Sequence, residues 1–158
     1  MKFALDAQDR GNSLCFLRFP PPNVADERKE GPGCAMPDTI FIVDDDDAVR
    51  DSLKLLLESY GLTVEDFSST AEFVRHYRPG GRQCLVLDQH LPGSTGLDFL
   101  ASRDGALLHL PVILVTGRGD AALRARAVAL GVSSYLEKPV NDDVLLRAIR
   151  GAVDGSAC

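Results

Sequence analysis

Four consecutive carboxylates, at residues 44–47, follow an apolar run at residues 39–43. Like charges this close in sequence repel one another, so the packing of a fold does not by itself explain them. They either form a solvated loop or bind a cation. Clustered carboxylate oxygens suit a hard divalent cation, and Mg²⁺ is the usual choice in phosphate chemistry. The run therefore raises the question of which other reactive side chains lie near it.

Three further side chains stand at the ends of strand-like segments: Asp88 ends residues 84–88, Thr116 ends residues 112–116, and Lys138 follows residues 133–137. If these segments are parallel strands, their ends meet at one edge of a sheet, beside Asp44 and Asp45. There a carboxylate oxygen can attack a phosphoryl group, while Thr116 and Lys138 hydrogen-bond and neutralise its oxygens. Without a metal, mutual repulsion is expected to raise the pKa of at least one carboxylate.

The spacing of apolar residues predicts the elements that position these groups. Five strand-like segments alternate with five helical segments. The strands are expected at residues 39–43, 62–67, 84–88, 112–116 and 133–137, and the helices at 49–60, 69–77, 96–108, 121–130 and after Asn141. Alternation of this kind predicts one α/β domain built on a doubly wound parallel sheet.

Capping residues mark where three of these helices begin. The expected caps are Asp47 for the first helix, Ser69 with Glu72 at capping-box spacing for the second, and Asn141 for the last. Asp46 and Asp47 also favour the positive end of a helix dipole, so we expect neither of them to take part in chemistry.

The bulk composition narrows the classes of protein to which the chain can belong. The chain has 158 residues, of which 45% are hydrophobic and 25% charged, as in a globular domain with its own core. Its net charge of −6 argues against direct nucleic-acid binding. No apolar run is long enough to span a membrane. The four cysteines form no CxxC pair, and Cys84 lies in an apolar run, which favours a reduced, cytoplasmic protein without disulfides.

The first 37 residues differ from the rest because they lack sustained periodicity and carry Pro-Pro-Pro and Gly-Pro-Gly. We predict that residues 1–37 are a disordered leader or a non-native extension, with Met36 as the natural start. Residues 38–153 are predicted to form the domain, and residues 154–158 a C-terminal tail.

Several short motifs then occur together and in order. They are Asp44-Asp45, Leu87-Asp88-Gln-His-Leu-Pro92 with Gly96, Val115-Thr116-Gly117, and Tyr135-Leu-Glu-Lys138-Pro139. With these motifs, residues 38–153 resemble the receiver domain of two-component response regulators. The resemblance is to the chemotaxis-regulator type, and the motifs are most similar to those in receivers of LuxR-type transcription regulators. It implies a flavodoxin-like fold with the strand order 2-1-3-4-5.

The resemblance also implies roles for the acidic residues. Asp88 would accept a phosphoryl group from a histidine kinase or a histidine phosphotransfer protein. Mg²⁺ would be bound directly by Asp45, Asp88 and the backbone carbonyl of His90, and mainly through water by Asp44.

Five residues would act on that phosphoryl group or respond to it. Thr116 and Lys138 would contact it, and Tyr135 would turn inward as Thr116 moves. His90 and Arg118 occupy positions that tune the lifetime of the phosphoryl group in this family. The surface of the fourth helix, fifth strand and fifth helix would change shape and bind an unknown downstream protein or a second copy of the chain. Such a protein is a signalling switch, and not an enzyme apart from catalysing its own aspartyl phosphorylation and dephosphorylation.

The sequence leaves other functions open. The chain fits the receiver portion of a DNA-binding transcription regulator or of a hybrid kinase. An independent Mg²⁺-dependent aspartyl phosphohydrolase is the less favoured alternative. Such enzymes usually carry the nucleophile in a DxD motif after the first strand, whereas Asp88 ends the third.

Overall fold

The structure is a computed structural model and describes residues 38–155 of the chain. Its centre is a five-stranded sheet of β1 (Thr39–Val43), β2 (Thr63–Phe67), β3 (Gln83–Asp88), β6 (Val112–Thr116) and β7 (Ser134–Glu137). All of these strands pair in parallel, in the order β2-β1-β3-β6-β7. Counted among themselves, they have the predicted order 2-1-3-4-5, so the doubly wound α/β fold is confirmed.

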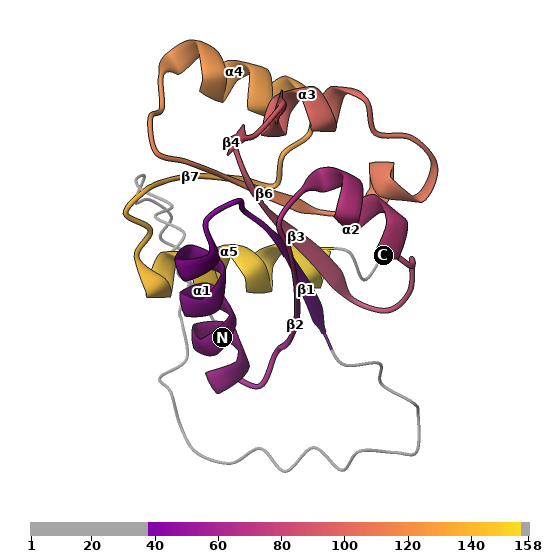
Figure 1. Ribbon diagram of the computed structural model, residues 1–158, viewed down its shortest axis with the longest axis vertical. Coiled ribbons are helices and arrows are strands. Elements are labelled where there is room, and N and C mark those ends of the chain that lie inside the picture. The colour runs from indigo at the N-terminus through magenta and orange to yellow at the C-terminus, as the bar shows by residue number, and fades with distance from the viewer. Residues whose placement is uncertain (1–37, 156–158) are drawn as a thin grey trace, which may run out of the picture. The chain divides into compact units, whose positions relative to one another are not determined.

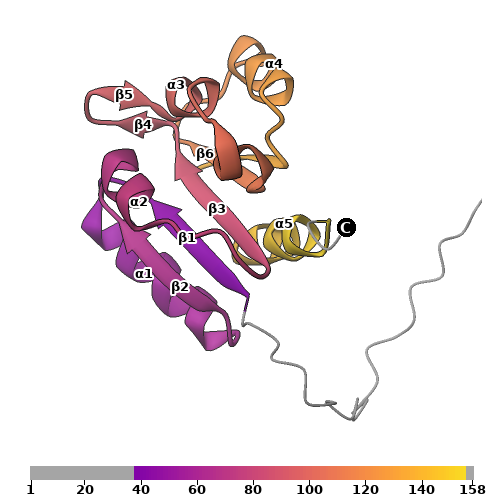
Figure 2. The ribbon, with the colours of Figure 1, turned by 90° about the vertical axis from the view of Figure 1, so that its right-hand side faces the viewer.

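Helices cover both faces of this sheet (Figure 1 and Figure 2). One face carries α1 (Asp47–Ser59) and α5 (Asp142–Gly155), and the other carries α2 (Thr70–His76), α3 (Gly96–Ala101) and α4 (Ala121–Ala129). Successive side chains of a strand point to opposite faces. In β1, Ile40 and Ile42 therefore pack under α1 and α5, while Phe41 and Val43 pack under the other three helices. A strand covered on both sides is apolar throughout, as its sequence is.

The two apolar layers hold the ends of the strands in place. Every residue of β6 is buried, and Cys84 in β3 is a free thiol with no exposed surface, which confirms its predicted place in the core. Burial raises the pKa of the Cys84 thiol to about 12. Each fully buried Leu or Ile side chain contributes roughly 1.5–3 kcal/mol to folding. The residues that follow the strands are thus attached to a rigid base.

The segment predicted as one helix over residues 96–108 forms two shorter elements. α3 ends at Ala101, and the 3₁₀ helix η1 (Gly105–His109) follows after a break. Gly105 has a φ of +54°, a left-handed conformation that interrupts an α-helix and that glycine adopts without strain. The prediction of a continuous helix is wrong here because the spacing of apolar residues does not register this turn.

A small hairpin between β3 and α3 is absent from the predicted elements. Its strands are β4 (His90–Leu91) and β5 (Ser94–Thr95), which pair antiparallel. Gly93 in the connecting turn has a φ of +84°. Strands of two residues are too short to give a periodic signal, so the pattern of the sequence does not indicate them.

The caps of the helices agree with the sequence in two of three cases. The caps expected at Ser69 and Asn141 are confirmed, since both side chains accept hydrogen bonds from amides at the start of their helices. For α1 the cap is Asp46, whose side chain accepts from two amides at 2.9 and 3.3 Å. Asp47, the predicted cap, is the first residue of the helix and pairs with Arg50.

Within residues 38–155, no helix is both long and apolar enough to cross a membrane. The predicted leader at residues 1–37, with the candidate start Met36, lies outside the described residues. α5 continues through Gly155, and the last three residues of the chain also lie outside.

Candidate functional site

Two buried carboxylates and one lysine meet at the carboxyl edge of the sheet. Asp44 directly follows β1 and Asp88 ends β3, and these residues are only 4% and 5% exposed. Lys138 follows β7 and places its Nζ atom 2.9 Å from Asp44 Oδ2 and 3.0 Å from Asp88 Oδ1. Segments far apart in the sequence thus deliver two acids and an amine to one place, as the pattern of strand ends predicts.

Asp45 completes a cluster of three carboxylates. Asp44, Asp45 and Asp88 can each offer one oxygen, and these oxygens lie within 4.8 Å of one another. Asp45 is exposed whereas the other two are buried, so the cluster opens to solvent on one side. A set of oxygen donors with this charge fits Mg²⁺.

Backbone amides fix the orientation of both buried carboxylates. The amide of Asp46 donates to Asp44 Oδ1 at 2.9 Å, and the amide of His90 donates to Asp88 Oδ2 at 2.9 Å. In each carboxylate, therefore, one oxygen accepts a hydrogen bond from a backbone amide and the other contacts the ammonium of Lys138. The use of the His90 carbonyl as a metal ligand stays a prediction, and the residue itself is exposed.

The electrostatics of the site agree with the expected rise of a carboxylate pKa. Burial raises the pKa of Asp88, the hydrogen bond and charge of Lys138 lower it, and the charge of Asp44 raises it again. The direction is as predicted, but desolvation has a larger effect than the repulsion from which the rise was expected. Burial also opposes the charge of Lys138, yet its hydrogen bonds to Asp44 and Asp88 prevail and raise its pKa, so it remains an ammonium ion.

Gly96 and Gln89 pack the start of α3 against the end of β3, next to Asp88. A Cβ atom on Gly96 would lie 2.7 Å from the carbonyl oxygen of Asp88, so only glycine lets α3 approach the end of β3 this closely. The buried side chain of Gln89 accepts a hydrogen bond from the amide of Leu97 at 3.1 Å. Gln89 is not among the residues predicted for the site, although a polar residue that continues a buried strand is a signal for such a role.

Thr116 lies beside the cluster with its hydroxyl engaged by the following loop. The residue is fully buried, and its backbone carbonyl accepts from the amide of Lys138 at 2.8 Å. Its hydroxyl donates to the carbonyl of Arg118 at 2.8 Å and accepts from the amide of Arg118 at 3.2 Å. The structure therefore brings Thr116 to the predicted strand end but connects its side chain to the loop. Arg118 itself is exposed.

The same loop packs against Tyr135 in β7. A Cβ atom on Gly119 would lie 2.5 Å from the Tyr135 hydroxyl and 2.4 Å from a carboxylate oxygen of Glu137. The guanidinium of Arg124 lies 5.1 Å from the centre of the Tyr135 ring. The Tyr135 hydroxyl is buried and has no hydrogen-bond partner among the described residues. The loop after β6 therefore packs directly against the Tyr135 side chain, and no pattern in the sequence indicates that Gly119 makes this contact.

Comparison with known proteins gives the family of the chain. The family described as response regulator receiver domain matches residues 40–150. The chain belongs to this family. A receiver of this family is a phosphorylation-controlled switch of two-component signalling, so the predicted fold and general function are both confirmed.

Relatives and solved structures agree with the assignment. The receiver is 42% identical over 118 residues to the transcriptional regulatory protein FixJ of Azorhizobium caulinodans, a match that covers 75% of this chain and 56% of FixJ. It is 39% identical to nodulation protein W of Bradyrhizobium diazoefficiens, over 73% of this chain and 51% of that protein. The structure of the response regulator StyR has a TM-score of 0.71 at 35% identity, covering 77% of this chain and 62% of that one. The chain thus spans about half the length of the curated relatives it matches.

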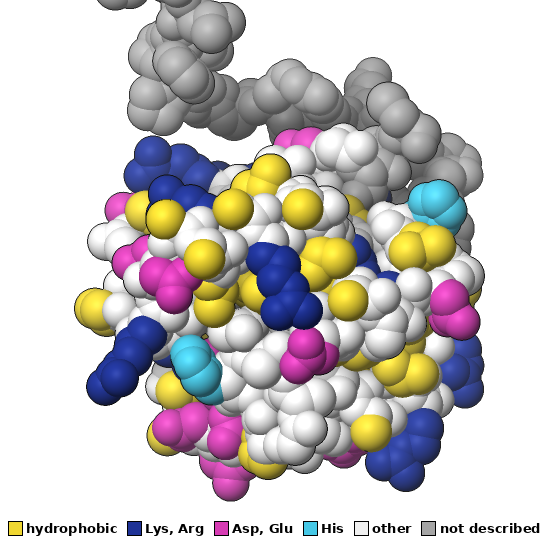
Figure 3. Space-filling view, turned by 90° about the horizontal axis from the view of Figure 1, so that it is seen from above, with side chains coloured by type: hydrophobic (Ala, Val, Ile, Leu, Met, Phe, Trp, Pro, Cys, Tyr) yellow, Lys and Arg dark blue, Asp and Glu magenta, His cyan; other side chains and the backbone are white. Residues whose placement is uncertain are grey.

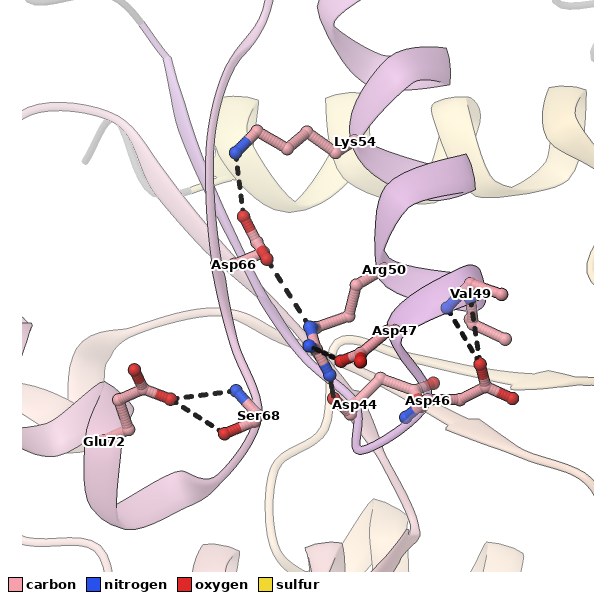
Figure 4. Close-up of polar contacts among 10 residues, drawn as sticks. Asp44, Asp46, Asp47, Val49, Arg50, Lys54, Asp66, Ser68 and Glu72 are labelled. Atoms are coloured by element: carbon pink, nitrogen blue, oxygen red, sulfur yellow. Dashed lines mark hydrogen bonds and ion pairs between the residues drawn. The ribbon is translucent and has the colours of Figure 1, made fainter.

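A row of four charged side chains lies next to Asp44, one member of the receiver's acidic cluster (Figure 4). Arg50 in α1 pairs with Asp47 and lies 3.5 Å from Asp66 in β2, and Lys54 donates to Asp66 at 2.8 Å. Arg50 also donates to the backbone carbonyl of Asp44 at 2.6 Å. Arg50 is not among the residues predicted for the site, although its spacing of three residues from Asp47 on a helix is a recognised signal for an ion pair.

Asp66 makes the stability of the receiver depend on pH. Its hydrogen bond to Lys54, together with the charges of Lys54 and Arg50, lowers the pKa of Asp66 below its ordinary value of 3.8. A depressed carboxylate pKa contributes stability that is present above the unfolded pKa and lost as pH falls through the folded pKa. Asp66→Asn is therefore expected to cost about 1 kcal/mol of unfolding free energy at pH 7 and nothing once pH falls below both pKa values.

Urea unfolding at a series of pH values tests this expectation. Glu65→Gln is the control, because Glu65 is the exposed neighbour of Asp66 on the same strand, where a substitution changes the unfolding free energy by less than about 0.5 kcal/mol. If the Asp66→Asn protein stayed destabilised by the same amount at all pH values, lost packing rather than ion pairing would explain the difference.

Acidic and basic side chains are interspersed on the face of the receiver that carries α3 and α4 (Figure 3). On α4, the exposed residue Arg126 lies 3.4 Å from Asp98 of α3, and Arg124 lies 3.8 Å from Glu137. Val128, also on α4, is 68% exposed. This face therefore offers both charges and an apolar side chain to a partner.

Proposed function

We propose that Asp88 is the phosphoacceptor of a phosphorelay and that Asp44, Asp45 and Asp88 bind the Mg²⁺ ion that the transfer requires. The observation that carries this proposal is the position of Lys138, whose ammonium bridges Asp44 and Asp88 at 2.9 and 3.0 Å. An ammonium fixed on the nucleophile is already placed to neutralise the oxygens of an incoming phosphoryl group. The phosphoryl donor is a histidine kinase or a histidine phosphotransfer protein.

The receiver's own groups account for transfer and hydrolysis. A carboxylate oxygen of Asp88 attacks the phosphorus of a phosphohistidine, an O–P bond forms, and the N–P bond breaks. The imidazole leaves with the electron pair and takes up a proton from solvent. The His90 amide keeps the carboxylate oriented during this step. Bound Mg²⁺ supplies further neutralisation of phosphoryl charge. In hydrolysis, water attacks the phosphorus and the Asp88 carboxylate leaves, at a rate tuned by the exposed residues His90 and Arg118.

The loop after β6 links this chemistry to the surface. A phosphoryl group on Asp88 adds charge and acceptor oxygens. The Thr116 hydroxyl, which donates to the carbonyl of Arg118, would then donate to a phosphoryl oxygen instead. Loss of the hydrogen bond to Arg118 would release the loop. Gly119 would move away from Tyr135, and the ring would turn inward. The change therefore reaches the surface of α4, β7 and α5.

That surface of α4, β7 and α5 is the proposed binding site for a downstream protein, or for a second receiver when both are phosphorylated. Such a partner is chosen by the difference in its affinity for the two states of the loop. We place the receiver in the cytoplasm, where histidine kinases deliver phosphoryl groups, and assign it no direct contact with nucleic acid or membrane.

A transcriptional output is the second candidate, and the relatives favour it. FixJ is described as a transcriptional regulatory protein, and this chain matches 56% of its length. The same receiver would then control DNA binding by another domain. The gene sequence downstream of this segment distinguishes this output from one that acts through protein contacts alone. The family match favours either of these over an independent phosphohydrolase.

Incubation with Mg²⁺ and acetyl phosphate tests the proposed function. We expect the intact mass to increase by one phosphate and the modification to lie in a peptide that contains Asp88. EDTA should prevent the reaction, and beryllofluoride with Mg²⁺ should shift the amide signals around Thr116 and Tyr135. A chain that gains no phosphate and binds no beryllofluoride would exclude this function.

A further inference from the structure

Arg50 connects the acidic loop after β1 to two neighbouring elements. Its guanidinium donates to the backbone carbonyl of Asp44 at 2.6 Å, and it is held by the carboxylates of Asp47 in α1 and Asp66 in β2 (Figure 4). The side chain of Arg50 is only 12% exposed. Its planar group of donors thus lies between the main chain of a candidate metal ligand and two acids that fix its direction.

The contact completes the hydrogen bonding of Asp44. The amide of Asp44 donates to the carbonyl of Phe67 at 3.3 Å, and its own carbonyl accepts from the guanidinium of Arg50. One carboxylate oxygen accepts from the amide of Asp46, and the other contacts the ammonium of Lys138. Asp44 is buried, and a buried carbonyl that loses its hydrogen-bond partner destabilises the conformation that buries it. Arg50 is the side-chain donor to this carbonyl, so without Arg50 the loop loses its hydrogen bond to α1 and the Asp44 side chain is held less firmly.

The charge of Arg50 is already balanced by its neighbours. Arg50 and Lys54 carry two positive charges and Asp47 and Asp66 two negative charges, so this row of side chains is formally neutral. Lys138 offsets only one of the three carboxylates of Asp44, Asp45 and Asp88, so the cluster keeps a net negative formal charge for a cation. The effect of Arg50 on the site is therefore one of position and not of charge.

We propose that Arg50 is a positioning residue, which holds Asp44 and Asp45 in the geometry that binds Mg²⁺. The inference rests on the proposed function, since it concerns the same metal site. Four consecutive carboxylates repel one another, and the loop that carries them needs a fixed anchor to present two of them toward Asp88. Arg50 is that anchor, and Asp66 with Lys54 keeps it in place.

Two explanations of Arg50 predict opposite changes in Mg²⁺ affinity. Arg50→Gln removes a positive charge near a cation site, so charge alone would make Mg²⁺ bind more tightly. If Arg50 positions the ligands, the same variant binds Mg²⁺ about tenfold more weakly, the usual effect of losing a group that orients a metal ligand. Arg50→Lys keeps the charge but not the planar group of donors, so it should restore only part of the affinity.

Calorimetric titration with Mg²⁺ at constant pH and well below the unfolding temperature measures this affinity. Arg147→Gln is the matched control, because Arg147 is an exposed helical arginine whose side chain, within residues 38–155, bonds only to the carbonyl of Asp143 in its own helix, at 3.2 Å. This variant should bind Mg²⁺ like the parent. Equal or tighter binding by the Arg50→Gln protein would overturn the proposal.

Hydrogen exchange without metal provides an independent readout. The Asp46 amide, which donates to Asp44 Oδ1, should exchange at least about tenfold faster in the Arg50→Gln protein, while amides in β3 and β6 keep their parent rates. Faster exchange at all sites would mean general destabilisation and would overturn the proposal. If the loop loosens as expected but the parent itself binds no Mg²⁺, the proposed function fails and Arg50 anchors a loop without a metal role, which also overturns the inference.

Discussion

Asp88→Asn is expected to abolish phosphorylation while making the metal-free receiver more stable. An amide has no carboxylate oxygen to attack phosphorus, so the variant should gain no phosphate from acetyl phosphate under conditions that modify the parent fully. The stability should rise because burial and the charge of Asp44 raise the pKa of Asp88. A raised carboxylate pKa means that folding disfavours the ionised form, so at pH 7 this carboxylate opposes folding.

Mass spectrometry and urea unfolding in EDTA measure the two effects of Asp88→Asn. Asp46→Asn is a suitable control, because Asp46 belongs to the same acidic loop but caps α1, and asparagine caps a helix equally well. This control should take up phosphate like the parent. Phosphate uptake by the Asp88→Asn protein would place the acceptor elsewhere, and a loss of stability would mean that the hydrogen bonds of Asp88 outweigh the cost of burying its charge.

The position of the site follows from the sequence because it depends on the sheet. Apolar runs that end in Asp44, Asp88 and Thr116 predict parallel strands, and parallel strands in one sheet deliver their ends to one edge. The same argument places Lys138, which follows the last strand, at this edge beside both acids. The fold was predictable for the same reason, since alternating strands and helices allow few arrangements.

Other features depend on contacts that no periodic pattern contains. The break between α3 and η1 arises from the backbone conformation of Gly105, and the hairpin after Asp88 is too short to show alternation. Arg50 was not identified because its partners come from the loop, the helix and strand β2, and Asp66 becomes its neighbour only when β2 pairs with β1. Burial is the largest cause of the raised pKa of Asp88, and its effect could not be predicted because the sequence does not show how deeply the end of β3 is buried.

Lys138→Met is expected to slow phosphorylation by acetyl phosphate by about 10²–10³-fold, the cost of losing one fixed donor to transition-state charge. Without metal it should also lower the unfolding free energy by about 2 kcal/mol, because it leaves two buried carboxylates without their cation. The removal of one partner from a fully buried ion pair costs more, but the Lys138 side chain is 31% exposed. Asp44 and Asp88, whose side chains are each 5% exposed, would then face each other without a cation.

Mg²⁺ should distinguish the role of Lys138 from that of Arg50. Loss of the ammonium removes a positive charge that competes directly for Asp44 and Asp88, so the Lys138→Met protein should bind Mg²⁺ more tightly and regain more stability from it than the parent does. Phosphorylation should nevertheless stay slow, because tighter metal binding does not restore the N–H donors that Lys138 supplies to the phosphoryl oxygens. Arg82→Met is the control, because Arg82 lies just before β3, at the opposite end of the strand from Asp88, and pairs with Asp38 and Asp154. This variant should lose stability but keep its phosphorylation rate within about threefold. A Lys138→Met protein that Mg²⁺ restores to the parent's rate would show that Lys138 neutralises the resting carboxylates and takes no part in the transfer.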